Sequence, residues 1–167
     1  YLQYQNYNNE VMEKNLEYYK EQCQEIANMI ANEVTDAKSV KIDCGGFCPY
    51  LCFIRIDALD KKDYLNNISD NSIFIDIEID FQENKFELFK DGRIYLSPKD
   101  KKRPQFKYLA MRGMVNIAEE KGVKKMRKTK HKDNKITANK IALYFNEVMK
   151  AVKEYTGGYP YKQGIEE

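Results

Sequence analysis

The sequence predicts an α+β fold with an N-terminal helix, an antiparallel four- to five-stranded meander and two C-terminal helices. Apolar residues recur at every third or fourth position near both ends of the chain, which is the spacing of one helix face. In residues 73–81, apolar and polar side chains alternate strictly, as in a half-buried strand. Short apolar runs bounded by turn residues flank that strand and favour antiparallel neighbours.

The chain has 167 residues, which is enough to bury one hydrophobic core without disulfides or metal ions. We find no internal repeat and no linker between domains. We therefore expect a flexible segment over residues 1–8, a single α+β domain over 9–158 and an extended tail over 159–167.

The first helix is predicted from about Asn9 to Val34. Its apolar residues are spaced by three or four positions and form one stripe, while glutamate, glutamine and lysine occupy the other face. This spacing would also suit a coiled coil, but only three to four repeats are present, so a helix packed on a sheet is the favoured interpretation. The stripe consists of Met12, Leu16, Tyr19, Cys23, Ile26, Ile30 and Val34.

Four or five strands are expected to follow this helix. Residues 39–44 and 51–58 are short apolar runs, and residues 73–81 place five apolar side chains on one face of a strand. The turn QENK leads from there into residues 86–90. Asp91-Gly92 is a typical type I′ hairpin sequence, which predicts that residues 86–90 pair with 93–97.

Two helices are predicted in the last third of the chain. Residues 105–121 are apolar on nearly every side, which indicates a central helix, and Gly122 is placed to end it. For the last helix we expect Thr137 as N-cap and Gly157-Gly158 as the stop signal. Its apolar stripe consists of Ile141, Tyr144, Phe145, Val148, Val152 and Tyr155.

Three of the four cysteines lie in the segment CGGFCPYLC, at Cys44, Cys48 and Cys52. The favoured interpretation is packed thiols around a turn between two strands, formed by Gly45-Gly46 and Pro49. A metal site is the alternative, and it would need Cys23 as the fourth ligand. A redox or disulfide role remains open. The spacing lacks the paired C-x₂-C motifs of zinc sites, so we predict no cofactor and no metal.

Asp76, Glu78 and Asp80 stand on one face of the predicted strand 73–81, about 7 Å apart in sequence steps of two. Carboxylates in this arrangement can hold Mg²⁺ for phosphodiester hydrolysis. A metal-dependent nuclease is therefore one functional hypothesis, ranked third behind the two given below. The favoured interpretation is a solvated sheet face, with Arg55 and Lys85 as partners on neighbouring strands.

Positive charge is concentrated in one segment of the chain. Residues 99–132 hold 13 lysines and arginines against three acidic residues, a net charge of +10, whereas the rest holds 15 basic and 23 acidic residues, a net of −8. Such asymmetry is typical of a surface that binds nucleic acid or another polyanion. The predicted contacts are Lys101, Lys102, Arg103, Lys107, Lys124, Lys125, Arg127, Lys128 and Lys130.

The leading functional hypothesis is a non-catalytic domain that binds nucleic acid or a nucleoprotein complex through residues 99–132. The alternative is a protein-interaction module or assembly component that uses the first helix or the aromatic tail, which is defined by Tyr155, Tyr159 and Tyr161. An acidic protein is the other candidate partner for the basic segment. We find no phosphate-binding loop, no dinucleotide-binding motif and no nucleophile with a base, so catalysis is not the favoured interpretation and no catalytic residue is assigned.

The sequence also bears on where the protein acts. No apolar run approaches the roughly 18 residues that a membrane span requires, so we expect no membrane partner. The first residues lack a basic segment followed by an apolar one, which is unlike a signal peptide. Four cysteines in 167 residues are too few for a disulfide scaffold, which favours the cytoplasm.

Overall fold

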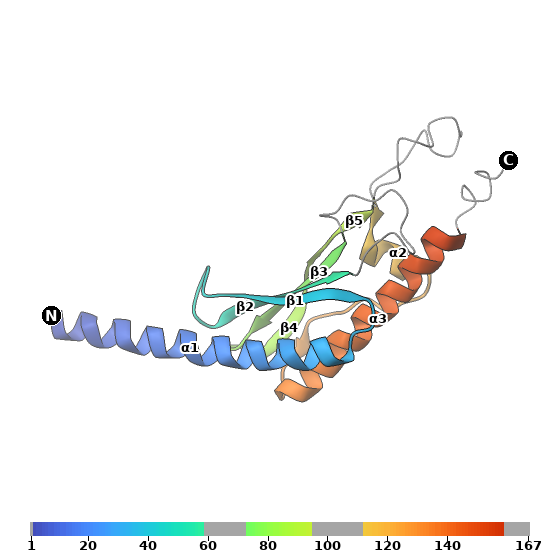
Figure 1. Ribbon diagram of the computed structural model, residues 1–167. Coiled ribbons are helices and arrows are strands. Elements are labelled where there is room, and N and C mark those ends of the chain that lie inside the picture. Colours follow the sequence, from blue (N-terminus) through green and yellow to red (C-terminus); the bar gives the residue numbers. More distant parts are fainter. Residues whose placement is uncertain (1, 59–72, 95–111, 159–167) are drawn as a thin grey trace.

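In the computed structural model, residues 2–58, 73–94 and 112–158 are described. They form an α+β fold in which long helices lie at the two ends of the described chain and strands lie between them, as predicted (Figure 1). The elements are α1 (Leu2–Glu33), β1 (Ala37–Cys44), β2 (Leu51–Ala58), β3 (Phe74–Asp80), β4 (Lys85–Asp91), β5 (Arg93–Ile94), β6 (Arg112–Gly113), α2 (Met114–Glu120), β7 (Thr129–Lys130) and α3 (Asn134–Gly158).

The main sheet has five antiparallel strands in the order β1-β2-β3-β4-β7. Strands β1 to β4 follow one another as a meander, which confirms that part of the prediction. The turn after β3 is also as expected, because Asp80 Oδ1 accepts hydrogen bonds from the backbone N–H groups of Gln82 and Glu83 at 2.9 and 3.0 Å. Asn84, with a φ of 53°, completes the turn in the left-handed region.

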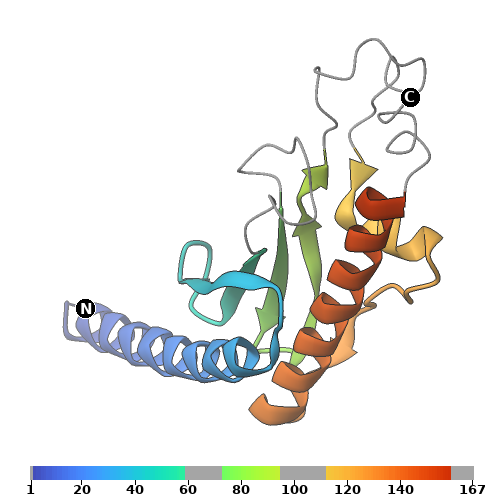
Figure 2. The ribbon, with the colours of Figure 1, turned by 45° about the vertical axis from the view of Figure 1, so that its right-hand side comes forward.

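One face of this sheet is covered by helices, and the core lies there (Figure 2). Ile54, Ile56, Ile75, Ile77 and Ile79 are fully buried on that face and pack against residues of α1 and α3. Apolar and polar residues alternate along these strands because one face of the sheet is covered and the other is open. The apolar stripes of both long helices cover the isoleucines, as their spacing predicted. The buried part of the α1 stripe consists of Cys23, Ile26 and Ile30, and that of the α3 stripe consists of Ile141, Tyr144, Phe145, Val148 and Val152.

The predicted hairpin between residues 86–90 and 93–97 is wrong. Among the described residues, β5 pairs with β6 in a separate two-stranded sheet, and the edge of β4 is occupied by β7 instead. A type I′ turn needs positive φ at both central residues, and Gly92 is not among the described glycines with positive φ. Its N–H instead donates to the carbonyl of Phe74 at 2.7 Å, so the chain passes on along β3.

The central helix is also shorter than predicted. Of the predicted helix 105–121, residues 105–111 lie outside the described residues, Arg112–Gly113 is strand β6, and only Met114–Glu120 is helical. The reason is tertiary, because Asp91 Oδ2 accepts a hydrogen bond from the N–H of Val115 at 2.8 Å and caps the helix there. The predicted end is confirmed, since Gly122 has a φ of 95° directly after the helix.

Both long helices begin earlier than the sequence predicted. Helix α1 begins at Leu2 rather than Asn9. Helix α3 begins at Asn134, and Thr137 lies inside it, so Thr137 is not the N-cap. Asp133 takes that role, because its Oδ1 accepts a hydrogen bond from the N–H of Ile136 at 2.8 Å. Thr137 is buried within α3, where it lies beside His131.

Candidate functional site

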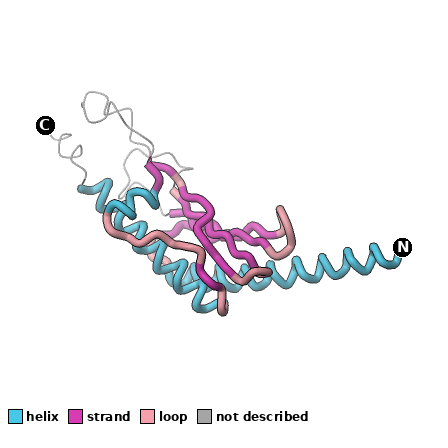
Figure 3. Tube along the Cα trace, turned by 180° about the vertical axis from the view of Figure 1, so that it is seen from behind, coloured by secondary structure: helices cyan, strands magenta, loops and turns pink. Residues whose placement is uncertain are grey.

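The connection between α2 and α3, residues 121–132, is called the basic strap here. It carries the described part of the positively charged segment, and Figure 3 shows it running from α2 along the body of the protein to β7. All five predicted contact residues within it are exposed: Lys124, Lys125, Arg127, Lys128 and Lys130. The predicted contacts Lys101, Lys102, Arg103 and Lys107 lie outside the described residues, as do Tyr159 and Tyr161 of the aromatic tail.

The basic strap is attached to the body at regular intervals. Val123 and Met126 are half-buried against the core, and Thr129 belongs to β7, where it pairs with Phe86 of β4. At its end, the N–H of His131 donates to the carbonyl of Asn84 at 2.8 Å. The attachment points are three residues apart, so the basic side chains between them face the solvent. The three-residue spacing of Val123, Met126 and Thr129 is the sequence signal that indicates these attachment points.

Acidic residues balance the two ends of the basic strap unequally. At its start, Lys121 and Lys124 line a hollow of about 450 Å³ together with Glu147 and Glu154 of α3. Towards its end, Lys128 lies close enough to Glu78 to counter the rise in the pKa of that carboxyl, which burial, Glu87 and Asp80 cause. No ion pair between described residues involves the strap residues at 124, 125, 127, 128 or 130.

His131 lies near the end of the basic strap and is the only histidine in the chain. Its ring lies edge-on to Phe81, with centroids 5.5 Å apart, and its Nδ1 is 2.5 Å from Thr137 Oγ1. Burial lowers the pKa of His131 below its usual 6.5, although Asp133 opposes this effect. Glu25, Lys132 and Lys135 line the same shallow surface hollow. The folded protein therefore takes up a proton at His131 less readily than the unfolded chain does.

This difference in pKa predicts that the free energy of unfolding decreases when the pH is lowered below about 6.5. Below about pH 6.5 the unfolded chain is protonated at His131 before the folded protein is, so the free energy of unfolding decreases as the pH falls through the lowered pKa. His131→Gln should flatten that decrease, because this is the only histidine in the chain. Urea unfolding of both proteins between about pH 7.5 and pH 5.5 measures it. Parallel pH profiles for the two proteins would contradict the assignment.

The open face of the sheet does not bring the predicted carboxylates together. Asp76 is buried and bound at both oxygens by Arg55, with Nε–Oδ1 at 2.7 Å and Nη2–Oδ2 at 2.9 Å. Lys90 lies 3.8 Å from the same carboxylate. The expected pairing of Arg55 with the acidic face is confirmed, whereas Lys85 binds Glu83 at 2.6 Å. Because its oxygens are taken, Asp76 offers little to a magnesium ion, which argues against the nuclease hypothesis.

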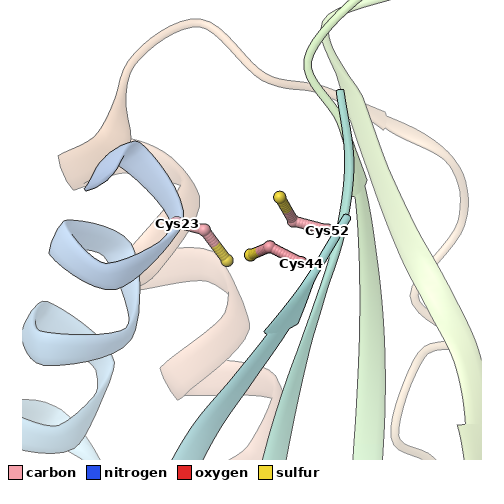
Figure 4. Close-up of side chains that lie close together, drawn as sticks. All are labelled: Cys23, Cys44 and Cys52. Atoms are coloured by element: carbon pink, nitrogen blue, oxygen red, sulfur yellow. The ribbon is translucent and has the colours of Figure 1, made fainter. Parts of the chain in front are cut away.

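The cysteines lie where α1 crosses the end of the sheet. The Sγ atoms of Cys23, Cys44 and Cys52 all lie within 4.8 Å of one another, and Figure 4 shows the three side chains converging from α1, β1 and β2. Cys23 and Cys52 are fully buried, whereas Cys44 is half-exposed. Cys48 is not part of this group. Among the described residues, no other set of three or more cysteine, histidine or acidic side chains comes together in this way.

The pKa values of the three thiols are shifted in different directions. Hydrogen bonds from Cys23 and from Cys52 lower the pKa of Cys44 to about 4, and Lys20 acts in the same direction against burial. The pKa of Cys23 is raised by its hydrogen bonds to Cys44 and Cys52 and by burial. For Cys52, the bond with Cys23 lowers the pKa, but the bond with Cys44 and burial outweigh it and raise the pKa to about 12. Within the cluster, the half-exposed Cys44 is therefore the thiol that loses its proton most readily.

The backbone around Cys44 holds the cluster in place. Gly45 has a φ of 79°, and a Cβ at this position would lie 2.5 Å from Cδ1 of Leu16. The positive φ favours glycine at this position, and a larger residue would also have to displace the end of the Leu16 side chain. Cys44 and Cys52 are directly opposite each other in the register of β1 and β2.

Comparison with protein families, with curated proteins and with solved structures finds no match for this chain. No helix among the described residues is both long and apolar enough to span a membrane. The described residues define an α+β protein with a half-covered sheet, an exposed basic strap and a cluster of three thiols. Its function is therefore inferred from these features.

Proposed function

We propose that this protein binds nucleic acid, alone or within a nucleoprotein complex, through its basic strap and without catalysis. The observation that carries the proposal is the exposure of five strap cations, which alternate with the attachment points at Val123, Met126, Thr129 and His131. Lysine and arginine neutralise phosphates and release the counterions that nucleic acids condense, which favours binding without base recognition. The attachment lowers the entropy cost of ordering the segment on a ligand.

The neighbourhood of the strap supports a nucleic acid more than a small anion. The hollow beside Lys121 and Lys124 is wide and shallow and carries both signs of charge, which does not suit a single enclosed phosphate. A row of cations along a connector suits a chain of phosphates instead. Lys85 of β4 is the register partner of Lys130 and lies beside this row, with its charge paired to Glu83.

The test is a matched pair of charge-neutralised proteins. Lys125→Gln/Lys128→Gln removes two charges from the strap, and Lys38→Gln/Lys41→Gln removes two exposed charges from β1. If both strap residues contact phosphates, the slope of log K against log salt should become shallower by about 2 units in the first protein. Affinity at low salt should fall at least about tenfold in the same protein. The β1 control should keep both the slope and the affinity of the natural sequence.

Fluorescence anisotropy with single-stranded and double-stranded DNA and RNA, over a range of salt concentrations, gives both quantities. Binding that ignores ionic strength would refute the proposal, as would equal losses in the two double variants. No binding to any of these probes at low salt would also refute it.

A second candidate function is supported by the shape of the molecule. In all three views the N-terminal half of α1 extends beyond the sheet, and none of the drawn helices or strands lies against it (Figures 1, 2 and 3). A helical segment of about four turns that packs on nothing else is only marginally stable in water. A protein partner along this half of α1 would therefore stabilise it. Affinity capture with the full chain and with residues 2–14 deleted, each with and without nuclease, separates a protein partner from one held by nucleic acid.

A further inference from the structure

We propose that Cys23, Cys44 and Cys52 form a three-thiolate site for a thiophilic metal ion, with Zn²⁺ as the ion that fits best. The inference concerns the junction of α1 with the sheet and does not depend on the proposed binding of nucleic acid. It rests on the convergence of three sulfur atoms from three separate segments on one point.

The distances suit a bound ion after a small adjustment. Sulfur ligands lie about 2.3 Å from Zn²⁺, so three of them in tetrahedral directions are about 3.8 Å apart. The Sγ atoms of the cluster are separated by at most 4.8 Å. Figure 4 shows the sulfurs of Cys23 and Cys44 directed towards each other and that of Cys52 directed along the sheet. Because all three Sγ atoms already lie within 4.8 Å of one another, rotation of the side chains, chiefly that of Cys52, would close the difference. Each thiol that binds the ion gives up its proton to the solvent.

Packing of apolar thiols is the simpler explanation, since cysteine is a common core residue. The residues around the three thiols favour a metal site over simple packing. The rest of the covered face of β2 and β3 consists of isoleucines and Ala58, and these side chains do not oxidise. The cysteines replace larger apolar residues only where the stripe of α1 meets the end of the sheet. Their sulfurs meet although Cys23 is far from the other two in sequence.

The site is accessible from one side. Cys23 and Cys52 are fully buried, which keeps water from two of the ligands, while the half-exposed Cys44 leaves an entry path for an ion. The fourth position on a tetrahedral ion would be filled by water, as in open zinc sites. Three thiolates and Zn²⁺ carry a net charge of about −1, and Lys20, one helical turn before Cys23, offsets it.

The experiment uses the full chain, reduced and freed of metal with a chelator. We expect one Zn²⁺ per chain by native mass spectrometry, protection of three thiols from a thiol reagent, and a higher melting temperature with Zn²⁺ than without. Co²⁺ in place of Zn²⁺ should give the near-ultraviolet absorption band of thiolate-to-cobalt charge transfer.

Two variants each replace one thiol by a hydroxyl, one within the cluster and one outside it. Cys44→Ser alters the half-exposed ligand, so the protein should still fold, and Zn²⁺ should bind at least about tenfold more weakly. Cys48→Ser removes a thiol from the adjacent loop and should leave stoichiometry and affinity unchanged. Circular dichroism of both metal-free variants shows whether they keep the fold.

Four results would overturn the proposal. The first is a reduced, folded chain that retains no Zn²⁺ at equimolar concentration, and the second is bound Co²⁺ without the charge-transfer band. The third is loss of binding in Cys48→Ser with retention in Cys44→Ser. A disulfide that forms between two of the three thiols while Zn²⁺ is present would likewise show a redox role instead of a metal site.

Discussion

Phe86→Ala is expected to lower the free energy of unfolding by about 3–5 kcal/mol, which is a large part of the roughly 5–15 kcal/mol that stabilises a typical domain. The ring is 1% exposed, and it lies on the covered face of β4 opposite Ile79 of β3. Its loss leaves a cavity between the sheet and the helices that these residues cannot fill. Phe86 also pairs with Thr129 of β7, so the attachment of the basic strap should weaken as well.

A matched control lies on the same strand. Phe89 is 53% exposed on the open face, where its main described aromatic contact is Phe53, with ring centroids 4.9 Å apart. Phe89→Ala should cost no more than about 1 kcal/mol, because little apolar area is lost. Urea unfolding followed by circular dichroism measures both values, with the slope against urea expected to stay constant. Equal losses for the two variants would mean that the covered face of the sheet is assigned wrongly.

The second large effect is expected at the ion pair of the open face. Arg55→Met should destabilise the protein by about 3 kcal/mol, because the carboxylate of Asp76 would stay in place without its bidentate partner. The Asp76 side chain is only 8% exposed, whereas that of Arg55 is 41% exposed. Lys90, 3.8 Å away, is too distant to replace two short hydrogen bonds. The contact of Arg55 with the ring of Phe74, at 4.0 Å, is lost as well.

The partner substitution should be milder. In Asp76→Ala the guanidinium of Arg55 can turn towards water, so we expect a loss of about 1–2 kcal/mol. The double variant should be more stable than the sum of the two losses implies, since the charge left behind is removed with its partner. Lys41→Met provides the control, because Lys41 is exposed beside Arg55 in the register of β1 and should change stability by less than about 0.5 kcal/mol. An additive double variant would show that the two side chains do not interact.

Several elements of the fold could be predicted because their cause is local. Alternation in β2 and β3 and the stripes of α1 and α3 reflect which side chains face the core, and that period is written directly in the sequence. The end of α2 was predictable at Gly122 for a similar reason, since only glycine adopts its backbone angle cheaply. The pairing of Arg55 with the acidic face was foreseen from opposite charges on neighbouring strands, although Asp76 was not singled out as its buried partner.

The errors have a common cause in contacts between distant segments. Asp91-Gly92 has the composition of a hairpin turn, yet β7, which lies far along the chain, occupies the edge of β4. The predicted helix start near 105 ignored the pairing of Arg112–Gly113 with β5 and the cap that Asp91 supplies. Local propensity is worth a few tenths of a kcal/mol per residue, so one pairing or one cap is enough to override it.

By itself the sequence determined the class of fold, the faces of the long helices and of the central strands, and the segment in which positive charge gathers. Only the tertiary structure decided which strand borders β4, how the basic strap is attached, and that Cys23 lies with Cys44 and Cys52 while Cys48 does not. The reason is physical. Periodicity and charge are properties of neighbouring residues, whereas the meeting of α1 with the end of the sheet depends on how the whole core packs.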